Sequence, residues 1–421
     1  MCCEVTGHIF SGGFILPFFV HTSLKNQNKG EKESHMLIVN GKILTMSEDN
    51  RIYEKGYLEI TDGKIVDVGD MRRLNWREKN QQDGILDATN AIVMPGLIDA
   101  HSHVGICEEK KGEIGDDCNE GTNPVTPSLR AMDAINPMDA AFHEAISAGI
   151  TGVMVGPGSA NVIGGQFAFI KTDGRCIDEM VVKQPAAMKA ALGENPKVNY
   201  GEQNECPATR MASAALLRKT LRRAKDYDPD KGWDADLEAM QGVIRKEIPL
   251  KVHVHRADDI FTAIRIAREF DINITLDHCT EGHLIAEYIK EAGYPAIVGP
   301  DLTSKSKIEV ENMSFKTCGV LQKAGVLTAI TTDHPVSLLQ YLPICAGLTV
   351  RAGLPLMEAY RAITINPAKI CGVDDRLGSL EVGKDADIAI FDGNPMETMT
   401  KTLYTIINGK VIYKKEDNNY R

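Results

Sequence analysis

Short apolar runs alternate with longer amphipathic segments through the middle of the chain. The runs at 249–255 and 272–278 have β-type composition, and each is followed by a segment whose apolar residues recur at helical spacing. Similar runs lie at 150–156 and 326–334. This number of strand and helix units in one region predicts an α/β fold with a TIM-like (β/α)8 barrel. An open doubly wound sheet is the alternative, but no glycine-rich dinucleotide-binding fingerprint follows the first strand.

Both ends of the chain have a different pattern, in which short β-rich runs are separated by turn pairs. Asn-Gly pairs stand at Asn40 and Asn408, and such pairs between β-rich runs are typical of hairpins. We therefore expect residues 36–95 and 378–421 to form one small β-sandwich domain. Residues 96–377 would form the barrel between them.

The first 35 residues lack this regular pattern. The stretch 9–20, IFSGGFILPFFV, is apolar, but no Lys or Arg precedes it and no small-residue cleavage site stands out after it. These features argue against a secretory signal peptide. We interpret residues 1–35 as a disordered N-terminal extension outside the fold.

Composition narrows the classes of function. The 421 residues carry a formal net charge of −11, and an acidic surface repels phosphate backbones, which argues against nucleic-acid binding. No apolar run reaches membrane-spanning length, so no membrane partner is expected. The ten cysteines are scattered without a CxxC pair and are interpreted as reduced thiols, which favours the cytoplasm. The expected partner is a small-molecule substrate, and a homo-oligomer stays open.

The chemistry-bearing residues gather at the ends of predicted strands. In MPGLIDAHSHVG, residues 94–105, two histidines follow an apolar run and Asp99. Because side chains at i and i+2 of a strand point the same way, His101 and His103 should face the barrel axis together. Strand ends of a barrel open onto one face, so residues distant in sequence converge there. The residues expected to meet are His101, His103, His253, His255, His278 and Asp333.

This set of side chains predicts a metal site. Imidazole nitrogens and carboxylate oxygens are ligands that Zn²⁺ and similar divalent ions prefer. A single HxH pair is a weak signal, but burying this many titratable groups without a cation would be costly. We therefore predict a divalent metal, with Zn²⁺ as the expected cofactor and one or two ions bound.

Two stretches of the sequence resemble one known family. PGLIDAHSHVG (95–105) resembles the first metal motif of the amidohydrolase superfamily, metal-dependent hydrolases on (β/α)8 barrels. The stretch 363–395, ITINPAKICGVDDRLGSLEVGKDADIAIFDGNP, resembles that superfamily's return into its β-sandwich. The resemblance extends over 36–421 and is closest to the imidazolonepropionase-related amidohydrolases. Both motifs are specific to the superfamily and say little about substrate.

The resemblance implies a metal ligand at most strand ends. His101 and His103 match the ligands of strand one, His278 matches strand six, and Asp333 matches strand eight. His253 matches the histidine of strand five, with His255 as the alternative.

The ligand of strand four has two candidates in AAMKAALGENPK. Many relatives use a carboxylated lysine or a glutamate there to bridge two metals, and this chain offers Lys189 and Glu194. Glu194 is slightly preferred, because it needs no modification and lies where the strand should end. If neither residue is a ligand, the site holds one ion.

The reaction that the resemblance implies is hydrolysis of a C–N bond in an amide, cyclic amide or N-acyl compound, other than a peptide bond. A metal-activated water would attack, Asp333 would act as general base and then acid, and His278 or His255 would stabilise the developing oxyanion. A ring-amidine deaminase and a dipeptidase are alternatives on the same scaffold. A non-catalytic oligomeric binding protein is the alternative from another class; such relatives usually lose metal ligands, whereas here every expected His and Asp position is filled.

Substrate contacts are also expected outside the strand ends. Arg210 and Arg256 are candidate partners for a substrate carboxylate, because a guanidinium matches its fork geometry. The stretch 155–172 is rich in Gly, Ser and Asn and is interpreted as a substrate-facing loop that offers Asn161 or Gln166.

Overall fold

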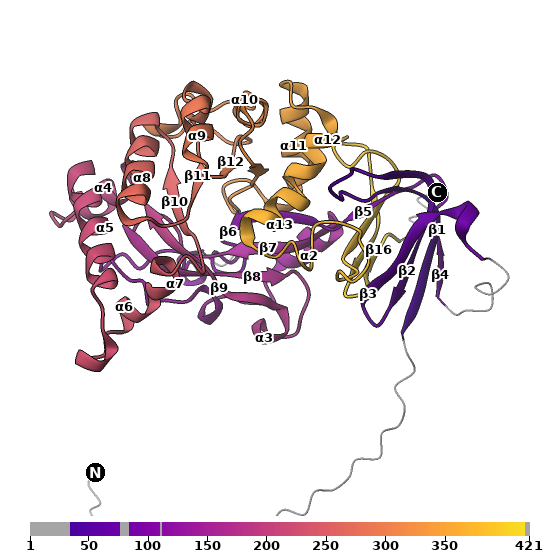
Figure 1. The fold of residues 1–421 in the computed structure, drawn as a ribbon, viewed down its shortest axis with the longest axis horizontal. Helices are drawn as coiled ribbons and strands as arrows, with labels where there is room; N and C mark the ends of the chain where they lie inside the picture. Colours follow the sequence, from indigo (N-terminus) through magenta and orange to yellow (C-terminus); the bar gives the residue numbers. More distant parts are fainter. Residues whose placement is uncertain (1–33, 76–83, 110–111, 417–421) are drawn as a thin grey trace, which may run out of the picture. The chain divides into compact units, whose positions relative to one another are not determined.

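The computed structural model describes residues 34–75, 84–109 and 112–416 (Figure 1). The extension predicted at 1–35 lies outside these ranges except for its last two residues, so its disorder stays a prediction. Within the described part of the chain, no helix combines the length and the apolarity that a bilayer crossing requires.

An eight-stranded sheet with nearly closed strand order forms the barrel. Apart from β8, neighbouring strands that pair directly are parallel. Asp99 on the first strand accepts hydrogen bonds from Thr331 and Thr332, which directly follow the last strand, and these bonds close the ring. The predicted barrel is thus confirmed. In spatial order its strands are β6 (Leu97–Ser102), β7 (Ile150–Val155), β8 (Ile163–Lys171), β9 (Val181–Ala191), β10 (Leu250–Val254), β11 (Ile274–His278), β12 (Ala296–Val298) and β13 (Thr328–Ile330).

Strand β8 departs from the repeating pattern, because it runs antiparallel to both β7 and β9. The expectation of a loop throughout 155–172 is therefore wrong from Ile163 onwards. Phe167 and Phe169 alternate along β8 and are fully buried, so burial of these rings favours a strand where the glycines suggested a loop. Within this stretch, the segment 156–162 and the last residue, Thr172, remain irregular.

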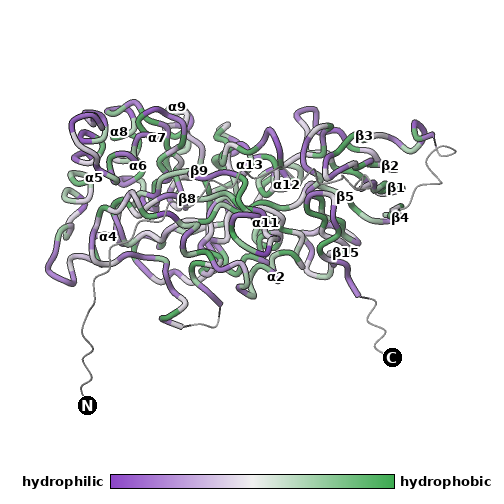
Figure 2. The backbone as a smooth tube through the Cα atoms, turned by 90° about the horizontal axis from the view of Figure 1, so that it is seen from below, coloured by the Kyte–Doolittle hydropathy of each residue, from purple (hydrophilic) through white to green (hydrophobic). Residues whose placement is uncertain are grey.

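Helices cover the outside of the barrel. In α8, Ile260, Ile264 and Ala267 recur at helical spacing and are buried, and the helix ends at Asp271 in the left-handed conformation. The tube coloured by hydropathy shows hydrophilic and hydrophobic stretches alternating along these helices, as amphipathic helices require (Figure 2). The α-helices are α2 (Ala140–Ser147), α3 (Ile177–Met180), α4 (Glu194–Gly201), α5 (Arg210–Lys225), α6 (Ala235–Ala239), α7 (Gln241–Ile244), α8 (Ala257–Phe270), α9 (Ala286–Ala292), α10 (Lys316–Ala324), α11 (Leu342–Arg351), α12 (Leu356–Ala362) and α13 (Ile365–Cys371).

The two chain ends share a second eight-stranded sheet. Strand β5 pairs antiparallel with β14, with Val93 opposite Ile390, so the N-terminal strands and the C-terminal strands form one sheet. This arrangement confirms the predicted second domain, while its boundaries at 36–95 and 378–421 stay predictions. The strands are β1 (His35–Leu44), β2 (Ile52–Thr61), β3 (Lys64–Asp70), β4 (Ile85–Asp87), β5 (Ile92–Pro95), β14 (Ile388–Phe391), β15 (Thr402–Ile407) and β16 (Lys410–Lys414).

A buried charge network links the barrel to this second sheet. Lys171, the last residue of β8, donates from Nζ to Asp385 Oδ2 at 2.8 Å, to Asp387 Oδ1 at 2.9 Å and to Asn408 Oδ1 at 2.5 Å. Lys171 and both aspartates are buried. The network therefore satisfies an ammonium and two carboxylates that would be costly to bury unpaired.

Candidate metal centre and active site

Among the described residues, three groups of three side chains have the spacing of a metal site, with one ligand atom per residue within 4.8 Å of the others. In one of them, Cys107, Asp116 and Cys118, a disulfide joins the two cysteines, so it offers no thiolate ligand. The two groups that contain histidine are His101, His103 and Asp333, and His253, His255 and His278.

The two groups form one continuous cluster at the C-terminal ends of β6, β10, β11 and β13. Asp333 Oδ1 lies 3.2 Å from His103 Nε2 and 3.5 Å from His101 Nε2, and its Oδ2 lies 3.9 Å from His278 Nδ1. The His278 ring lies 5.0 Å from the His101 ring and 4.4 Å from the His253 ring, between centroids. The strand ends thus converge as the sequence predicted.

Backbone carbonyls orient two of the imidazoles. The Nδ1 atom of His103 is 2.6 Å from the Gly156 carbonyl, and that of His278 is 2.8 Å from the Gly299 carbonyl. Because a carbonyl can only accept, both histidines carry the proton on Nδ1, and Nε2 keeps its lone pair for the cluster.

His101 is held by a chain of buried charged groups that the sequence reading missed. Its Nδ1 lies 2.6 Å from Asp277 Oδ2, and Lys251 Nζ forms an ion pair with the same oxygen at 2.9 Å and donates to the Ala100 carbonyl at 3.1 Å. Lys251, His253 and His255 are spaced by two, which was the available signal that the lysine also faces the barrel interior.

The imidazoles are in the form that binds metal. Burial lowers the pKa of His101, His253 and His255 well below the usual value, so all three are neutral near pH 7. Burial alone would raise the pKa of Asp333, but His278, His103 and His101 hold it well below its ordinary range. These three histidines therefore offer neutral nitrogens beside one anionic carboxylate.

Several buried polar atoms of the cluster have no hydrogen-bond partner among the described residues. These are both ring nitrogens of His253 and Oδ1 of Asp333. Buried polar atoms are nearly always paired, so unpaired ones in a cluster of this composition fit a bound cation. The residues present thus suit the divalent metal that the strand ends predicted.

The backbone is unusual at two of these residues. His278 and Asp333 have φ values of +69° and +52°, in the left-handed region that residues other than glycine rarely adopt. Such conformations tend to persist where the surrounding structure holds them for function.

The two candidates for strand four lie in different places. Lys189 is fully buried in β9, with Nζ 3.3 Å from His101 Nε2. Burial lowers its pKa to about 8, against the opposite effect of Asp277 and Asp333. Glu194 begins α4, and its carboxylate accepts from the Glu309 N–H at 3.4 Å. The structure therefore brings Lys189, and not Glu194, to the cluster.

Glu309 is a second residue that the sequence reading missed. It lies in the short η6 helix (Ile308–Val310) and is buried, with Oε1 at 3.5 Å from His253 Nε2 and 3.6 Å from His255 Nε2. Lys307 Nζ donates to the same oxygen at 2.6 Å. No periodic pattern marks the segment that carries both residues, so the sequence held little signal for them.

A cavity of about 270 Å³ opens onto the cluster. His103, His253, His255 and Asp333 line it, whereas Arg210 and Arg256 do not. These arginines pair instead with Asp259 and Asp258. The cavity is also lined by polar and apolar side chains outside the cluster, among them Ser159, Asn195, Lys307, Val310, Met313 and Val336.

Two cysteines beside this cavity are oxidised. Cys107 and Cys118 form a disulfide, so the expectation of reduced thiols is wrong for this pair. An isolated bridge between Cys107 and Asp116 folds the segment back and brings the two Cα atoms to 5.8 Å. The free cysteines among the described residues are Cys176, Cys206, Cys279, Cys318, Cys345 and Cys371.

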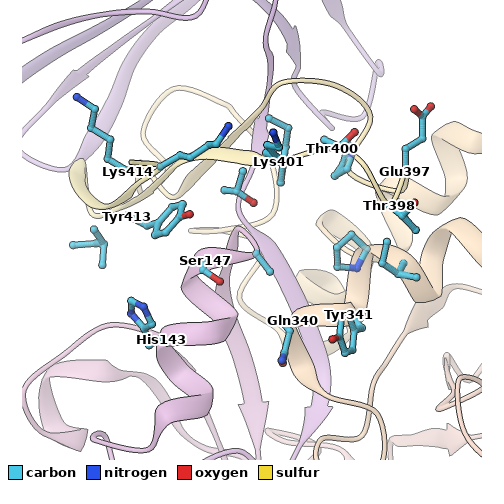
Figure 3. Close-up of a pocket in the computed structure, with 18 of the residues that line it drawn as sticks. His143, Ser147, Gln340, Tyr341, Glu397, Thr398, Thr400, Lys401, Tyr413 and Lys414 are labelled. Carbon is cyan, nitrogen blue, oxygen red and sulfur yellow. The ribbon is translucent and has the colours of Figure 1, made fainter. Parts of the chain in front are cut away.

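A larger cavity, of about 760 Å³, lies apart from the cluster (Figure 3). His143 and Ser147 of α2 face Tyr413 and Lys414 of β16 across it. No residue of the histidine cluster lines this cavity. It lacks the convergent ligand set, so we place the chemistry at the smaller cavity.

Comparison with known proteins identifies the family to which the chain belongs. Residues 92–412 match the sequence model of the amidohydrolase family, and the chain belongs to that family. Membership confirms the expected class of enzyme, a hydrolase of carbon–nitrogen bonds, with deaminase and dipeptidase chemistry compatible as alternatives.

Individual relatives are consistent with this class. An amidohydrolase structure from Thermotoga maritima is 38% identical, with a TM-score of 0.86 over 90% of this chain and 100% of that one. Amidohydrolase tasK of Hapsidospora irregularis is 27% identical over 77% of this chain, which spans 37% of that relative's length. A 5-methylthioadenosine/S-adenosylhomocysteine deaminase from Thermoanaerobacter pseudethanolicus is 23% identical over 91% of this chain and 94% of its own. A dihydroorotase and an imidazolonepropionase are further relatives, so the imidazolonepropionase-related enzymes are one of several similar groups.

Proposed function

We propose that this protein hydrolyses an amide-type C–N bond of a small molecule, in an amide, a cyclic amide or an N-acyl compound, at the histidine cluster. The observation that carries the proposal is the convergence of imidazoles and Asp333 from four strand ends, with buried ligand atoms left unpaired. A second, different function is not favoured by any contact in the cavity.

The proposed ligands are His101, His103, His253, His278 and Asp333, with Zn²⁺ as the proposed ion. When bound, a divalent ion lowers the pKa of water and polarises the substrate carbonyl. His253 is preferred to His255 for this set, because both ring nitrogens of His253 are unpaired, whereas His255 Nδ1 lies 2.7 Å from Thr280 Oγ1.

Lys189 is proposed to complete the set as a carbamate. The buried amine with a pKa of about 8 is partly neutral at pH 7 to 8, and a neutral amine can attack carbon dioxide. The N–C bond forms, one proton is released, and the ammonium that would repel a cation becomes an anionic oxygen ligand. This assignment replaces the preference for Glu194, whose carboxylate contacts the Glu309 backbone.

Asp333 and His255 are proposed to act on the substrate. Asp333 accepts a proton from the attacking water and returns it to the leaving nitrogen, for which its depressed pKa keeps it ionised at the start. His255 faces the cavity and hydrogen-bonds the carbonyl oxygen as negative charge develops there. His278 is assigned to the metal, because the Gly299 carbonyl holds its Nδ1 and leaves Nε2 for the cluster.

Metal analysis together with a substrate panel tests the proposal. Purified protein should contain one or two equivalents of zinc by plasma mass spectrometry, and chelation should abolish hydrolysis of at least one compound among N-acyl amino acids and cyclic amides. Ammonia release from ring amidines would favour the deaminase alternative, and cleavage of dipeptides the dipeptidase. If the purified protein contains no metal and cannot be reconstituted with it, the alternative of a non-catalytic binding protein would be favoured.

Two further proposals concern the location of the protein in the cell and its oligomeric state. We propose a cytoplasmic location, supported by the six cysteines that are free among the described residues against one disulfide, and an assembly of identical subunits. Cell fractionation tests the first, and light scattering coupled to size-exclusion chromatography tests the second.

A further inference from the structure

One wall of the active-site cavity is a fixed polar array from three separate segments. Asn195 Nδ2 donates to Ser159 Oγ at 2.6 Å. Lys307 Nζ donates to Asn195 Oδ1 at 2.7 Å and to Glu309 Oε1 at 2.6 Å. These bonds orient the Asn195 amide and hold the Lys307 ammonium at the cavity.

Each acceptor oxygen of the Asn195 and Glu309 side chains already receives one hydrogen bond within this array, whereas some of its donors have no acceptor. Asn195 Oδ1 accepts from Lys307, and the two Glu309 oxygens accept from Lys307 and, at 2.9 Å, from the Glu194 N–H. An ammonium has three N–H groups, an amide two and a hydroxyl one proton. Among the hydrogen bonds of the described residues, one N–H of Lys307, one N–H of Asn195 and the Ser159 O–H have no acceptor.

We propose that this array binds a carboxylate of the substrate. An ionised carboxylate only accepts hydrogen bonds, so it complements a wall with spare donors and used acceptors. One ammonium, already beside the Glu309 carboxylate, suits a single negative charge better than a doubly charged phosphate. The inference rests on the proposed function, because it names the substrate class of the same site.

The position of the array places this carboxylate close to the scissile bond. Glu309 Oε1 is 2.6 Å from Lys307 Nζ and 3.5 Å from His253 Nε2, so a single oxygen separates the ammonium from the cluster. The substrates that fit are N-acyl amino acids and ring amides that carry an acid group near the amide. Val310, Met313 and Val336 line the same cavity and offer apolar contact to the rest of the molecule.

We assign to Lys307 the binding of the substrate carboxylate, the role that the sequence suggested for an arginine. Arg210 and Arg256 pair with aspartates and do not line the cavity. Among the described residues that line it, Lys307 is the one lysine or arginine.

Matched acidic and neutral probes test the proposal with the metal-loaded enzyme. The pairs are N-acetyl-L-alanine with its methylamide, and dihydroorotate with dihydrouracil. Lys307→Met should raise KM for the acids by about 10- to 100-fold, the range expected for a lost charged hydrogen bond, with kcat within about threefold. The neutral partners should be unaffected. Ser159→Ala should shift KM in the same direction by less, and it leaves the Lys307–Glu309 pair in place.

Lys305→Met is the matched control. Lys305 is two residues away, donates to the Glu311 carbonyl and does not line the cavity, so this variant should behave as wild type. Equal losses on acidic and neutral probes in Lys307→Met, with no selective shift in Ser159→Ala, would overturn the inference and leave Lys307 as a support for Glu309.

A binding measurement separates this inference from the proposed function. Calorimetry in an Asp333→Asn background reports affinity without turnover. Acids that bind at least tenfold more tightly than their neutral partners, with the difference lost on adding Lys307→Met, support the array even if no probe is hydrolysed. Equal affinity for both members of each pair, or no binding of either, overturns it. Hydrolysis of none of the probes by the wild type counts against the proposed function alone.

Discussion

Asp277 and His101 form a fully buried hydrogen bond, with 2.6 Å between Oδ2 and Nδ1. Burial would raise the pKa of Asp277, but the charge of Lys251 and the His101 hydrogen bond hold it well below its usual range. The carboxylate therefore stays ionised and keeps the proton of His101 on Nδ1. This leaves Nε2 facing Asp333 as the proposed ligand atom.

Replacing this carboxylate should weaken metal binding. Asp277→Asn removes the charge that fixes the His101 tautomer and leaves Lys251 without its counter-ion. We expect metal affinity to fall by about 10- to 100-fold, as is typical when a partner of a ligating histidine is lost. Competition with a chromophoric chelator measures this. Asp271→Asn, at an exposed end of α8, is the control, and unchanged affinity in Asp277→Asn would refute the orienting role.

Asp333→Asn should separate catalysis from metal binding. The amide keeps the shape of the side chain but cannot accept and return a proton, so kcat should fall by about 10²- to 10⁴-fold. The remaining proposed ligands should retain metal, although with lower affinity. Steady-state kinetics and metal content are measured on the same preparation. Activity close to that of the wild type would exclude Asp333 as the general base.

The barrel and most of its cluster could be predicted because both follow from local periodicity. Side chains two apart share a strand face, and strand ends of a barrel share one opening, which is sufficient to bring His101 and His103 towards Asp333. The same rule could have favoured Lys189 over Glu194 as the ligand of strand four. Lys189 pairs in register with Lys251, two residues before His253, and both lysines are fully buried.

The remaining features depend on tertiary contacts that leave no periodic pattern in the sequence. The antiparallel course of β8 follows from burial of Phe167 and Phe169 in a segment whose glycines suggested a loop. After β12, Lys307 lines the cavity, and Glu309 in the short η6 helix lies beside His253 and His255. Their positions depend on tertiary packing, so the sequence alone could not distinguish them from surface residues.

Loss of Lys189 should change both metal content and activity. We expect Lys189→Ala to hold fewer ions than the wild type and to lose most activity, because the proposed anionic ligand beside His101 is removed. A short carboxylic acid such as acetate should restore part of the activity by occupying the vacated volume. Lys183→Ala, on the same strand but outside the cluster, is the control.

Carbon-13 NMR tests the carbamate itself. Wild-type protein equilibrated with labelled bicarbonate should show a carbamate signal that is absent from Lys189→Ala. Absence of the signal in the wild type, together with a full complement of metal in Lys189→Ala, would exclude the modification.

Acid should weaken the link between the barrel and the second sheet through Asp385. This carboxylate accepts from Lys171 at 2.8 Å, from Lys64 at 2.5 Å and from Arg376 at 2.8 Å. Burial alone would raise its pKa, but these three cations lower it from 3.8 to about 2. A depressed pKa in the folded state stabilises the fold above the unfolded value, and this stabilisation is lost as pH falls from about 4 to about 2.

The difference between wild type and Asp385→Asn isolates this term from other titrating groups. Above about pH 5 the variant should be less stable by about 2 kcal/mol, the free energy equivalent of the pKa shift. The gap should narrow below about pH 4, because Asp385 is then increasingly protonated in the unfolded wild type. Urea unfolding at several pH values between 3 and 7 measures the gap, with the exposed Asp375→Asn as control. A gap that stays constant across this range would show that Asp385 contributes through packing and not through its charge.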